Sequence, residues 1–353
     1  MPAVRCHHHE VTVRTLTARV LNRALLARQL LLERSTLSIP EAVEQVGGLQ
    51  MQYAPSGHVG LWTRLGDFPR HALTAALEDR SVIQASLMRV TIHIVSRREY
   101  WRYALGVRRA RQQWALRTSA GGGEEAAMVE AAVRIRAALA DGPRSVKDLG
   151  ELGAGFVGTL GLWVDLVRVP PSGTWERRRA DRLALAEDWI GAPDATEAEG
   201  LTHLVRAYLR AFGPSPWRDV ASWAGVTATD AKRGGEGLTL TSYRDEEGRP
   251  LVDLPDAPLP DPGTPAPVRF LPHWDANLLV HARRTQLLPE RYRPLVFSVR
   301  KPFSVGTYLV DGVVAGAWSA KDGRIVLDPF EDLTARNRRA VEREREALEA
   351  FHA

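Results

Sequence analysis

The chain has 353 residues, of which 44% are hydrophobic and 25% charged, and its formal net charge is +5. This composition is that of a folded globular protein and excludes a disordered or low-complexity chain. The single cysteine, Cys6, excludes an intramolecular disulfide, and no stretch reaches the ~18 uninterrupted apolar residues of a membrane span. We therefore expect a cytoplasmic protein of roughly two to four domains, with no membrane association and a charge compatible with a polyanionic partner.

Residues 1–14 are predicted to form a flexible tail. The run Cys6-His7-His8-His9-Glu10 contains side chains that could bind a soft metal ion. Adjacent side chains do not converge on one ion, however, and the sequence has no second ligand cluster with the spacing of a zinc site. We therefore predict neither a metal site nor a cofactor.

Two helices are predicted ahead of the most informative segment. Leucines recur at helical spacing over residues 17–32, which indicates an amphipathic helix with its apolar face in a core. A shorter helix should begin at Ser38-Ile39-Pro40-Glu41, where the serine can cap the first turn and the glutamate lies near the positive end of the helix dipole.

The segment Gly47-Gly48-Leu49-Gln50-Met51-Gln52-Tyr53-Ala54-Pro55 follows this helix. Its glycines and proline disfavour a helix, so we predict an extended or turning conformation. Residues two apart in such a segment point the same way, so Gln50 and Gln52 should share one face and Met51 should lie on the other. Two neutral amides could hold a water molecule or a nucleotide by hydrogen bonds, or could simply belong to a polar loop.

A short pattern occurs three times along the chain. Residues 142–149 resemble residues 213–220, and residues 38–43 form a third copy. Each copy follows a longer helix, predicted over 124–140 and 197–212 for the later two, and precedes strands predicted over 82–87, 90–95, 166–169, 238–241 and 251–254. Helices followed by a short hairpin are the winged-helix plan, a DNA-binding module that also serves in protein–protein contacts.

We therefore predict an α+β, mainly helical fold with three tandem winged-helix units, over residues 15–121, 122–190 and 191–255. Residues 256–267 are rich in proline and indicate a linker. Beyond it, residues 268–353 should form a C-terminal β region and a closing helix. Its clearest signal is Asp311-Gly312 between two apolar runs, which predicts a hairpin with a two-residue turn, and residues 333–351 read as a charged amphipathic helix.

Four segments together resemble one protein family. They are Leu49-Gln50-Met51-Gln52, residues 89–95 (RVTIHIV), residues 270–284 (from FLPHWDANLL to HARR) and residues 308–318 (YLVDGVVAGAW). In this order they resemble the AlkZ/YcaQ-type (AlkZ-like) DNA glycosylases, which are built of tandem winged helices, and the resemblance covers nearly the whole chain from about residue 15. In that family a Gln-x-Gln or Gln-x-Asp motif carries the chemistry, which implies Gln50 and Gln52 as the catalytic residues.

The resemblance also implies a substrate. The Gln-x-Gln branch includes enzymes that remove bulky N7-alkylguanines and unhook interstrand crosslinks, often in self-resistance to a DNA-alkylating natural product. We therefore expect a monomeric, metal-independent, monofunctional DNA glycosylase acting on double-stranded DNA that carries alkylated guanine. Alkylation at N7 places positive charge on the base, so the base leaves without a general acid, and a water molecule under C1′ remains to be positioned. We assign that water to Gln52, with Gln50 helping to hold the water or the deoxyribose.

Positive charge gathers between Arg80 and Thr118, where nine arginines accompany one acid, Glu99. We predict DNA contacts by Arg89, Thr91, His93, Arg108, Arg109 and Arg111, and by His281, Arg283 and Arg284 further on. A solvated helix face for the arginines of 108–111, and a structural, hydrogen-bonded His93, are the alternatives.

Other aromatic and acidic side chains are assigned to structure. Trp62, Trp101 and Trp163 lie in helical patterns and should be core residues. His273, Trp274 and Asp275 could contact DNA, but we favour Trp274 in the core and Asp275 as a cap. The rival functions are a non-catalytic winged-helix regulator, which would not need the two glutamines, and a protein–protein scaffold, which the arginine excess disfavours.

Overall fold

The computed structural model describes residues 13–118, 124–150, 162–279, 287–297 and 304–353. The predicted tail through residue 12, with Cys6 and its neighbouring histidines, lies outside these residues. The described chain is an α+β structure in which helices predominate, as the sequence predicts. Of the helices in these ranges, none is both long and apolar enough to cross a membrane.

The first group of elements ends with a long helix. It comprises β1 (Thr15–Leu16), α1 (Ala18–Arg28), α2 (Ile39–Gln45), β2 (Leu49–Gln50), α3 (Ala54–Trp62), α4 (His71–Glu78), β3 (Val82–Ser86), the 3-10 turn η1 (Met88–Val90), β4 (Ile92–Ser96) and α5 (Arg97–Thr118). As predicted, α2 begins at the serine cap, where the backbone N–H of Ser38 donates to Glu41 Oε2 at 3.0 Å.

The second and third groups repeat helices and strands. The second comprises α6 (Glu125–Leu139), β5 (Arg144–Ser145), α7 (Val146–Gly150), β6 (Leu166–Arg168), β7 (Arg182–Leu185) and α9 (Ala186–Ile190). The third comprises α10 (Glu197–Phe212), α11 (Trp217–Ala224), α12 (Ala228–Gly235), β8 (Thr241–Asp245) and β9 (Pro250–Asp253). The strand predicted from Leu238 begins later, at Thr241, because Leu238 and Leu240 pack against the main core as a connector.

The C-terminal group follows residues 256–267, which carry no helix or strand, as expected of a linker. It comprises β10 (Arg269–Leu271), η2 (Ala276–Leu278), η3 (Glu290–Tyr292), α13 (Arg293–Val296), β11 (Gly306–Val310), β12 (Val313–Lys321), β13 (Arg324–Pro329) and α14 (Ala335–His352). Asp311 and Gly312 both have positive φ, 49° and 79°, in the two-residue turn that their identity predicts.

The sheets cross the boundaries predicted between units. One six-stranded sheet has the order β2-β4-β3-β6-β7-β5. Strands that come before residue 121 in the chain therefore pair with strands that come after it. The parallel strand β1 joins the hairpin β8-β9 of the third group, with Thr15 opposite Arg244. The first three groups are therefore not structurally independent. Pairing between strands so far apart in the chain leaves no local pattern that sequence analysis could use.

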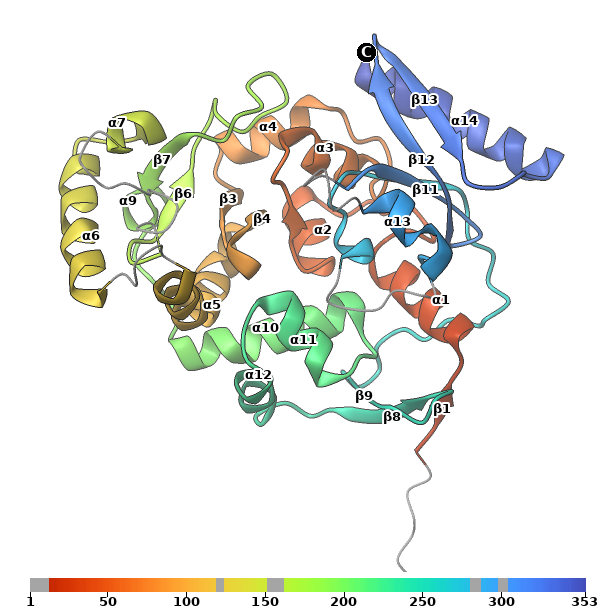
Figure 1. Ribbon diagram of the computed structural model, residues 1–353, viewed down its shortest axis with the longest axis horizontal. Coiled ribbons are helices and arrows are strands. Elements are labelled where there is room, and N and C mark those ends of the chain that lie inside the picture. Colours follow the sequence, from red (N-terminus) through yellow and green to blue (C-terminus); the bar gives the residue numbers. More distant parts are fainter. Residues whose placement is uncertain (1–12, 119–123, 151–161, 280–286, 298–303) are drawn as a thin grey trace, which may run out of the picture.

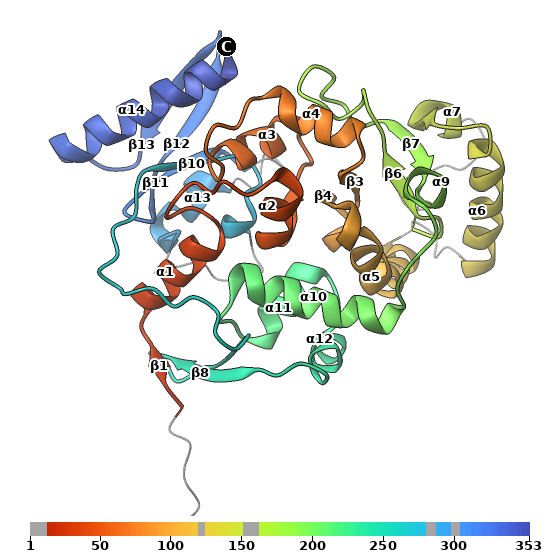
Figure 2. The ribbon, with the colours of Figure 1, turned by 180° about the vertical axis from the view of Figure 1, so that it is seen from behind.

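Figures 1 and 2 show how the groups are arranged. The second group, with α6 and α7, lies at one end of the molecule, and α14 with the β12–β13 hairpin lies at the other. The first group stands between them, and α10, α11 and α12 lie along one side. The second hydrophobic core packs β2 and β4 against strands of the C-terminal group, and β3 pairs with β6 of the second group.

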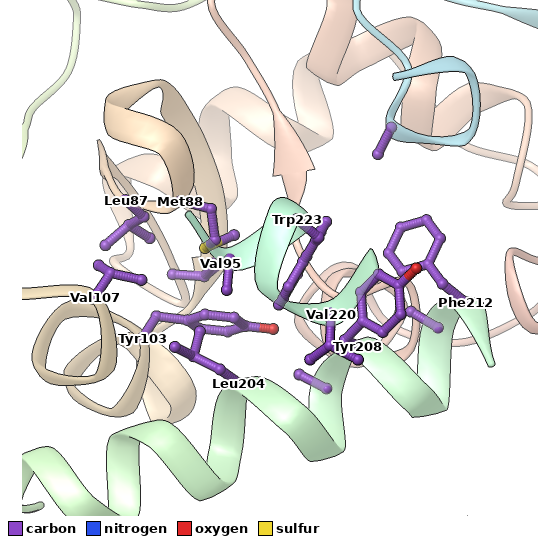
Figure 3. Close-up of a cluster of buried hydrophobic side chains, with 14 of the residues drawn as sticks. Leu87, Met88, Val95, Tyr103, Val107, Leu204, Tyr208, Phe212, Val220 and Trp223 are labelled. Atoms are coloured by element: carbon purple, nitrogen blue, oxygen red, sulfur yellow. The ribbon is translucent and has the colours of Figure 1, made fainter. Parts of the chain in front are cut away.

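The main hydrophobic core joins the first and third groups (Figure 3). It brings together the β3–β4 hairpin, α5, α10 and α11 through Leu87, Met88, Val95, Tyr103, Val107, Leu204, Tyr208, Phe212, Val220 and Trp223. Trp101 also belongs to this core, and Trp62 is buried in a second one, as predicted for both. Trp163 is partly buried against the core of the second group.

Helices α5 and α10 meet at one glycine from each. A Cβ atom added to Gly106 would lie 2.6 Å from the carbonyl oxygen of Gly200 and 2.9 Å from Leu204 Cδ1. Backbone atoms cannot move aside as a flexible side chain can, so only glycine at these positions lets the two helices approach so closely.

We expect Gly106→Ala to lower the free energy of unfolding by about 1–3 kcal/mol, because the added methyl group forces the two helices apart. Gly237→Ala is the matched control, since a Cβ atom there meets nothing within 4 Å. Urea denaturation of both variants measures the effect. Equal stability of the two variants would show that the helices separate at no cost.

Candidate active site

Two glycines place the glutamine segment at the edge of the sheet. Gly47 and Gly48 have φ values of 75° and 80°, in the left-handed region that glycine adopts without strain. A Cβ atom on Gly48 would also lie 3.3 Å from the carbonyl oxygen of Ile94. The chain thus turns sharply out of α2 into β2, where Gln50 pairs opposite His93 of β4.

The amides of Gln50 and Gln52 are both held against the turn that precedes β4. Gln50 is buried, and its Oε1 accepts a hydrogen bond from Arg89 Nη2 at 2.9 Å. Gln52 is exposed, and its Oε1 accepts from the backbone N–H of Ile92 at 3.0 Å. Met51 between them is buried in the second core. Each carbonyl oxygen therefore has a fixed donor, and its second lone pair is available for another hydrogen bond.

Arg89 connects the first group to the third. Its φ of 53° directs the side chain from the turn so that the guanidinium donates to Gln50 Oε1 and to the carbonyl oxygen of Trp223 in α11. Burial lowers the pKa of Arg89 to about 10, so it stays charged at neutral pH. This geometry assigns Arg89 to holding Gln50 in place, whereas the sequence suggested a contact with DNA.

His93 is a buried neutral histidine. Its Nδ1 lies 2.9 Å from the carbonyl oxygen of Thr91, so the proton of the neutral ring sits on Nδ1. Burial, together with the nearby charge of Arg89, lowers its pKa to about 3. The hydroxyl of Thr91 donates to the carbonyl oxygen of Met88 at 3.1 Å. Both side chains are therefore engaged within the turn, which matches the structural alternative for His93.

Part of the arginine-rich segment is neutralised by acids from other parts of the chain. Arg108 forms an ion pair with Asp165 at 2.5 Å, and Arg98 pairs with Glu44. Arg111 is buried and donates to the carbonyl oxygen of Ser86, which argues against contact with a phosphate. The prediction of a basic surface counted charges only within residues 80–118, so it did not include Glu44 and Asp165, which lie elsewhere in the sequence. The exposed Arg109 keeps its charge at the surface. His281, Arg283 and Arg284 lie outside the described residues.

The segment after β10 combines structural and cavity-lining residues. Asp275 caps η2 by accepting from the backbone N–H of Asn277 at 3.0 Å, as predicted, and it also pairs with buried Arg64 at 2.9 Å. His273 lines a cavity that Tyr53, the residue after Gln52, also lines. Sequence analysis missed this cavity, because its walls come from six separate regions of the chain.

Comparisons with known proteins identify the family and the fold. The model of the AlkZ-like DNA glycosylase family matches residues 43–351. The chain belongs to the AlkZ-like DNA glycosylase family. Its fold is similar to that of the Streptomyces sahachiroi DNA glycosylase AlkZ, with a TM-score of 0.78 at 21% sequence identity over 96% of this chain and 97% of that chain. A search of curated proteins found no match.

Membership in this family identifies a glycosylase with DNA as its substrate. It favours an enzyme over the rival winged-helix regulator. The Gln-x-Gln segment lies within the matched residues.

The burial of His93 predicts how stability depends on pH. With a folded pKa of about 3 against about 6.5 in the unfolded chain, the unfolded state binds one more proton between pH 6 and pH 5. His93 therefore stabilises the fold fully above pH 6.5, and this contribution is lost as the pH falls toward 3. In the wild type, His93 should make the free energy of unfolding fall by about 1 kcal/mol as the pH drops from 6 to 5. We expect His93→Asn to remove this part of the pH dependence, because the amide replaces the Nδ1 donor and does not take up a proton. Urea titrations at several pH values measure this slope, and an unchanged slope would contradict a neutral buried ring.

Proposed function

We propose that this enzyme is a monofunctional glycosylase that releases N7-alkylguanines from double-stranded DNA without a metal ion. The observation that carries the proposal is the pair of neutral amides at the end of β2, each held by a fixed N–H donor. Among the described residues, no carboxylate forms a hydrogen bond with Gln50, Gln52 or His93. A site of this kind can orient water but supplies no strong base or acid, so it suits a base that is already a good leaving group.

The chemistry needs little more than orientation. In N7-alkylguanine the C1′–N9 bond breaks with its electron pair going to the cationic ring, which leaves as a neutral base. Water adds to the oxocarbenium-like C1′ and releases its proton to solvent, giving an abasic site. The free lone pair of the exposed Gln52 amide can accept a hydrogen bond from that water. Gln50 is nearly buried, which suits the supporting role of holding the water or the sugar.

The fold supports binding to a duplex. We propose that the first three groups are winged helices; in the third, α10, α11 and α12 precede the β8–β9 hairpin in the order that this module requires. Arg109 is exposed on α5 and is the proposed phosphate contact of that helix. Crosslink unhooking and self-resistance to an alkylating natural product are the roles we propose for such an activity.

The test is release of 7-methylguanine from a duplex in the presence of EDTA. We expect an abasic site without strand cleavage, because neither glutamine supplies an amine for a Schiff base. Chromatography of the released base and alkaline cleavage of the strand measure the two outcomes. Intact binding to the duplex without any release would favour a non-catalytic DNA-binding protein.

The same assay separates catalysis from binding through variants. Gln52→Ala should lower the single-turnover rate by on the order of 100-fold with duplex affinity nearly unchanged, because the amide acts on the chemical step. Gln50→Ala should also lower the single-turnover rate. If both amides hold one water, the rate of the double variant should fall by less than the product of the two single effects. Gln52→Glu should retain part of the activity, since a carboxylate accepts the same hydrogen bond. The matched control is Gln113→Ala, an exposed glutamine on α5.

Wild-type rates for both alanine variants would make the glutamine segment a structural loop. That result would remove the catalytic assignment and leave the family membership standing.

A further inference from the structure

A cavity of about 630 Å³ is lined by Tyr53, the residue that follows Gln52. The residues that line it include five aromatic side chains: Tyr53 before α3, Trp175 between β6 and β7, His273 after β10, Trp318 of β12 and His352 of α14. Consecutive Cα atoms lie about 3.8 Å apart, so the Gln52 backbone adjoins a residue that lines the cavity.

The five rings form a continuous chain of four edge-to-face contacts. Tyr53 meets His273 and His273 meets Trp318, each with ring centroids 5.9 Å apart. Trp318 meets His352 at 5.9 Å, and His352 meets Trp175 at 5.1 Å. Interplanar angles of 69–87° exclude stacking between these neighbours. Such packing presents ring faces and edges to the enclosed space, which suits a further aromatic ring.

Arg178 contacts both ends of this chain of rings, Trp175 and Tyr53. Its Nη1 donates to the Tyr53 hydroxyl at 3.0 Å, and its guanidinium carbon lies 5.9 Å from the Trp175 ring centroid. Burial lowers the pKa of His352 to about 4 and also lowers the pKa of His273, so both rings are neutral at neutral pH. The wall is therefore aromatic and mostly uncharged, with Arg178 and Asp322 as the charged residues that line it.

Two polar groups at the cavity lack a partner. The Ser56 hydroxyl, on a residue only 3% exposed, and His352 Nε2 have no hydrogen-bond partner among the described residues. Both residues line the cavity, but these two atoms are themselves buried and do not face it, so they say nothing about the polarity of a ligand.

We propose that this cavity binds a planar aromatic group carried on N7 of the damaged guanine, and so sets a preference for aromatic adducts over small alkyl groups. The inference rests on the proposed function, because it places the deoxyribose of the lesion at Gln52. The volume lies in the range of sites that enclose drug-sized ligands, which is more than one nucleobase needs. An N7 substituent of a base held at Gln52 reaches the cavity without the base leaving the duplex, which matters where a crosslink prevents extrusion.

The test compares three duplexes with one adduct each: N7-methylguanine, N7-(quinolinylmethyl)guanine and N7-(cyclohexylmethyl)guanine. The cyclohexyl group separates aromatic recognition from bulk. For the wild type we expect the highest kcat/KM with the quinoline. In Trp175→Ala the ratio of kcat/KM for quinoline over methyl should fall about tenfold. Trp175→Leu, a milder change that keeps an apolar side chain at this position, should lower the same ratio about threefold.

Trp189→Ala is the matched control. Trp189 is likewise partly buried and lies under an arginine, with the Arg80 guanidinium carbon 3.9 Å from its ring centroid, but it does not line the cavity. The quinoline-to-methyl ratio should be unchanged in this variant.

The other outcomes overturn the inference. An unchanged ratio in both Trp175→Ala and Trp175→Leu would show that the cavity does not receive the adduct. A parallel loss on all three duplexes would show that it receives the base itself. If the wild type releases none of the three bases, the proposed function itself is contradicted. If it releases methylguanine but shows no preference for the aromatic adduct, only this inference is contradicted.

Discussion

The close approach of α5 and α10 at Gly106 and Gly200 governs the geometry of the candidate site. Helix α5 continues from β4, and α10 leads into α11, so the distance between these helices sets the distance between the β3–β4 hairpin and α11. Arg89 spans that distance, with hydrogen bonds to the Trp223 carbonyl oxygen and to Gln50. The distance between the helices, which requires glycine at both positions, therefore determines through Arg89 where the proposed catalytic amide of Gln50 lies.

The electrostatics of this connection explain why an amide suits the position. Buried Arg28 and Arg64 pair with Asp253 and Asp275. Burial lowers the pKa of Arg89, and its hydrogen-bond partners among the described residues are carbonyl oxygens. A carboxylate in place of Gln50 would form an ion pair with this cation and lose its freedom to contact substrate. An amide instead accepts one hydrogen bond from the guanidinium and keeps a second lone pair.

The sequence predicts well whatever depends on local chemistry. Helix α10 has the predicted bounds, α2 begins at its serine cap, and Asp311-Gly312 forms the expected turn. The glutamine segment is extended at Leu49–Gln50 and bends at Gln52, with Met51 buried in the second core.

Features that depend on distant partners were not predictable. The pairing of β3 with β6 joins two predicted domains, and the acids Glu44 and Asp165 neutralise arginines that looked like a basic surface. The partner of Gln50 is 39 residues away in the chain, and the aromatic cavity gathers rings from residues 53 to 352. No periodicity or motif records such contacts, and a single sequence carries no other signal of them.

The central claim is that the deoxyribose of the lesion lies against Gln50 and Gln52. A crystal structure of the enzyme with duplex DNA containing a pyrrolidine mimic of the oxocarbenium sugar tests this claim most directly. The account predicts that the amide oxygen of Gln52 lies within hydrogen-bond reach of the pyrrolidine, at about 2.6–3.2 Å or through one water, with Gln50 still bound to Arg89. A pyrrolidine bound beyond the reach of both amides would contradict it.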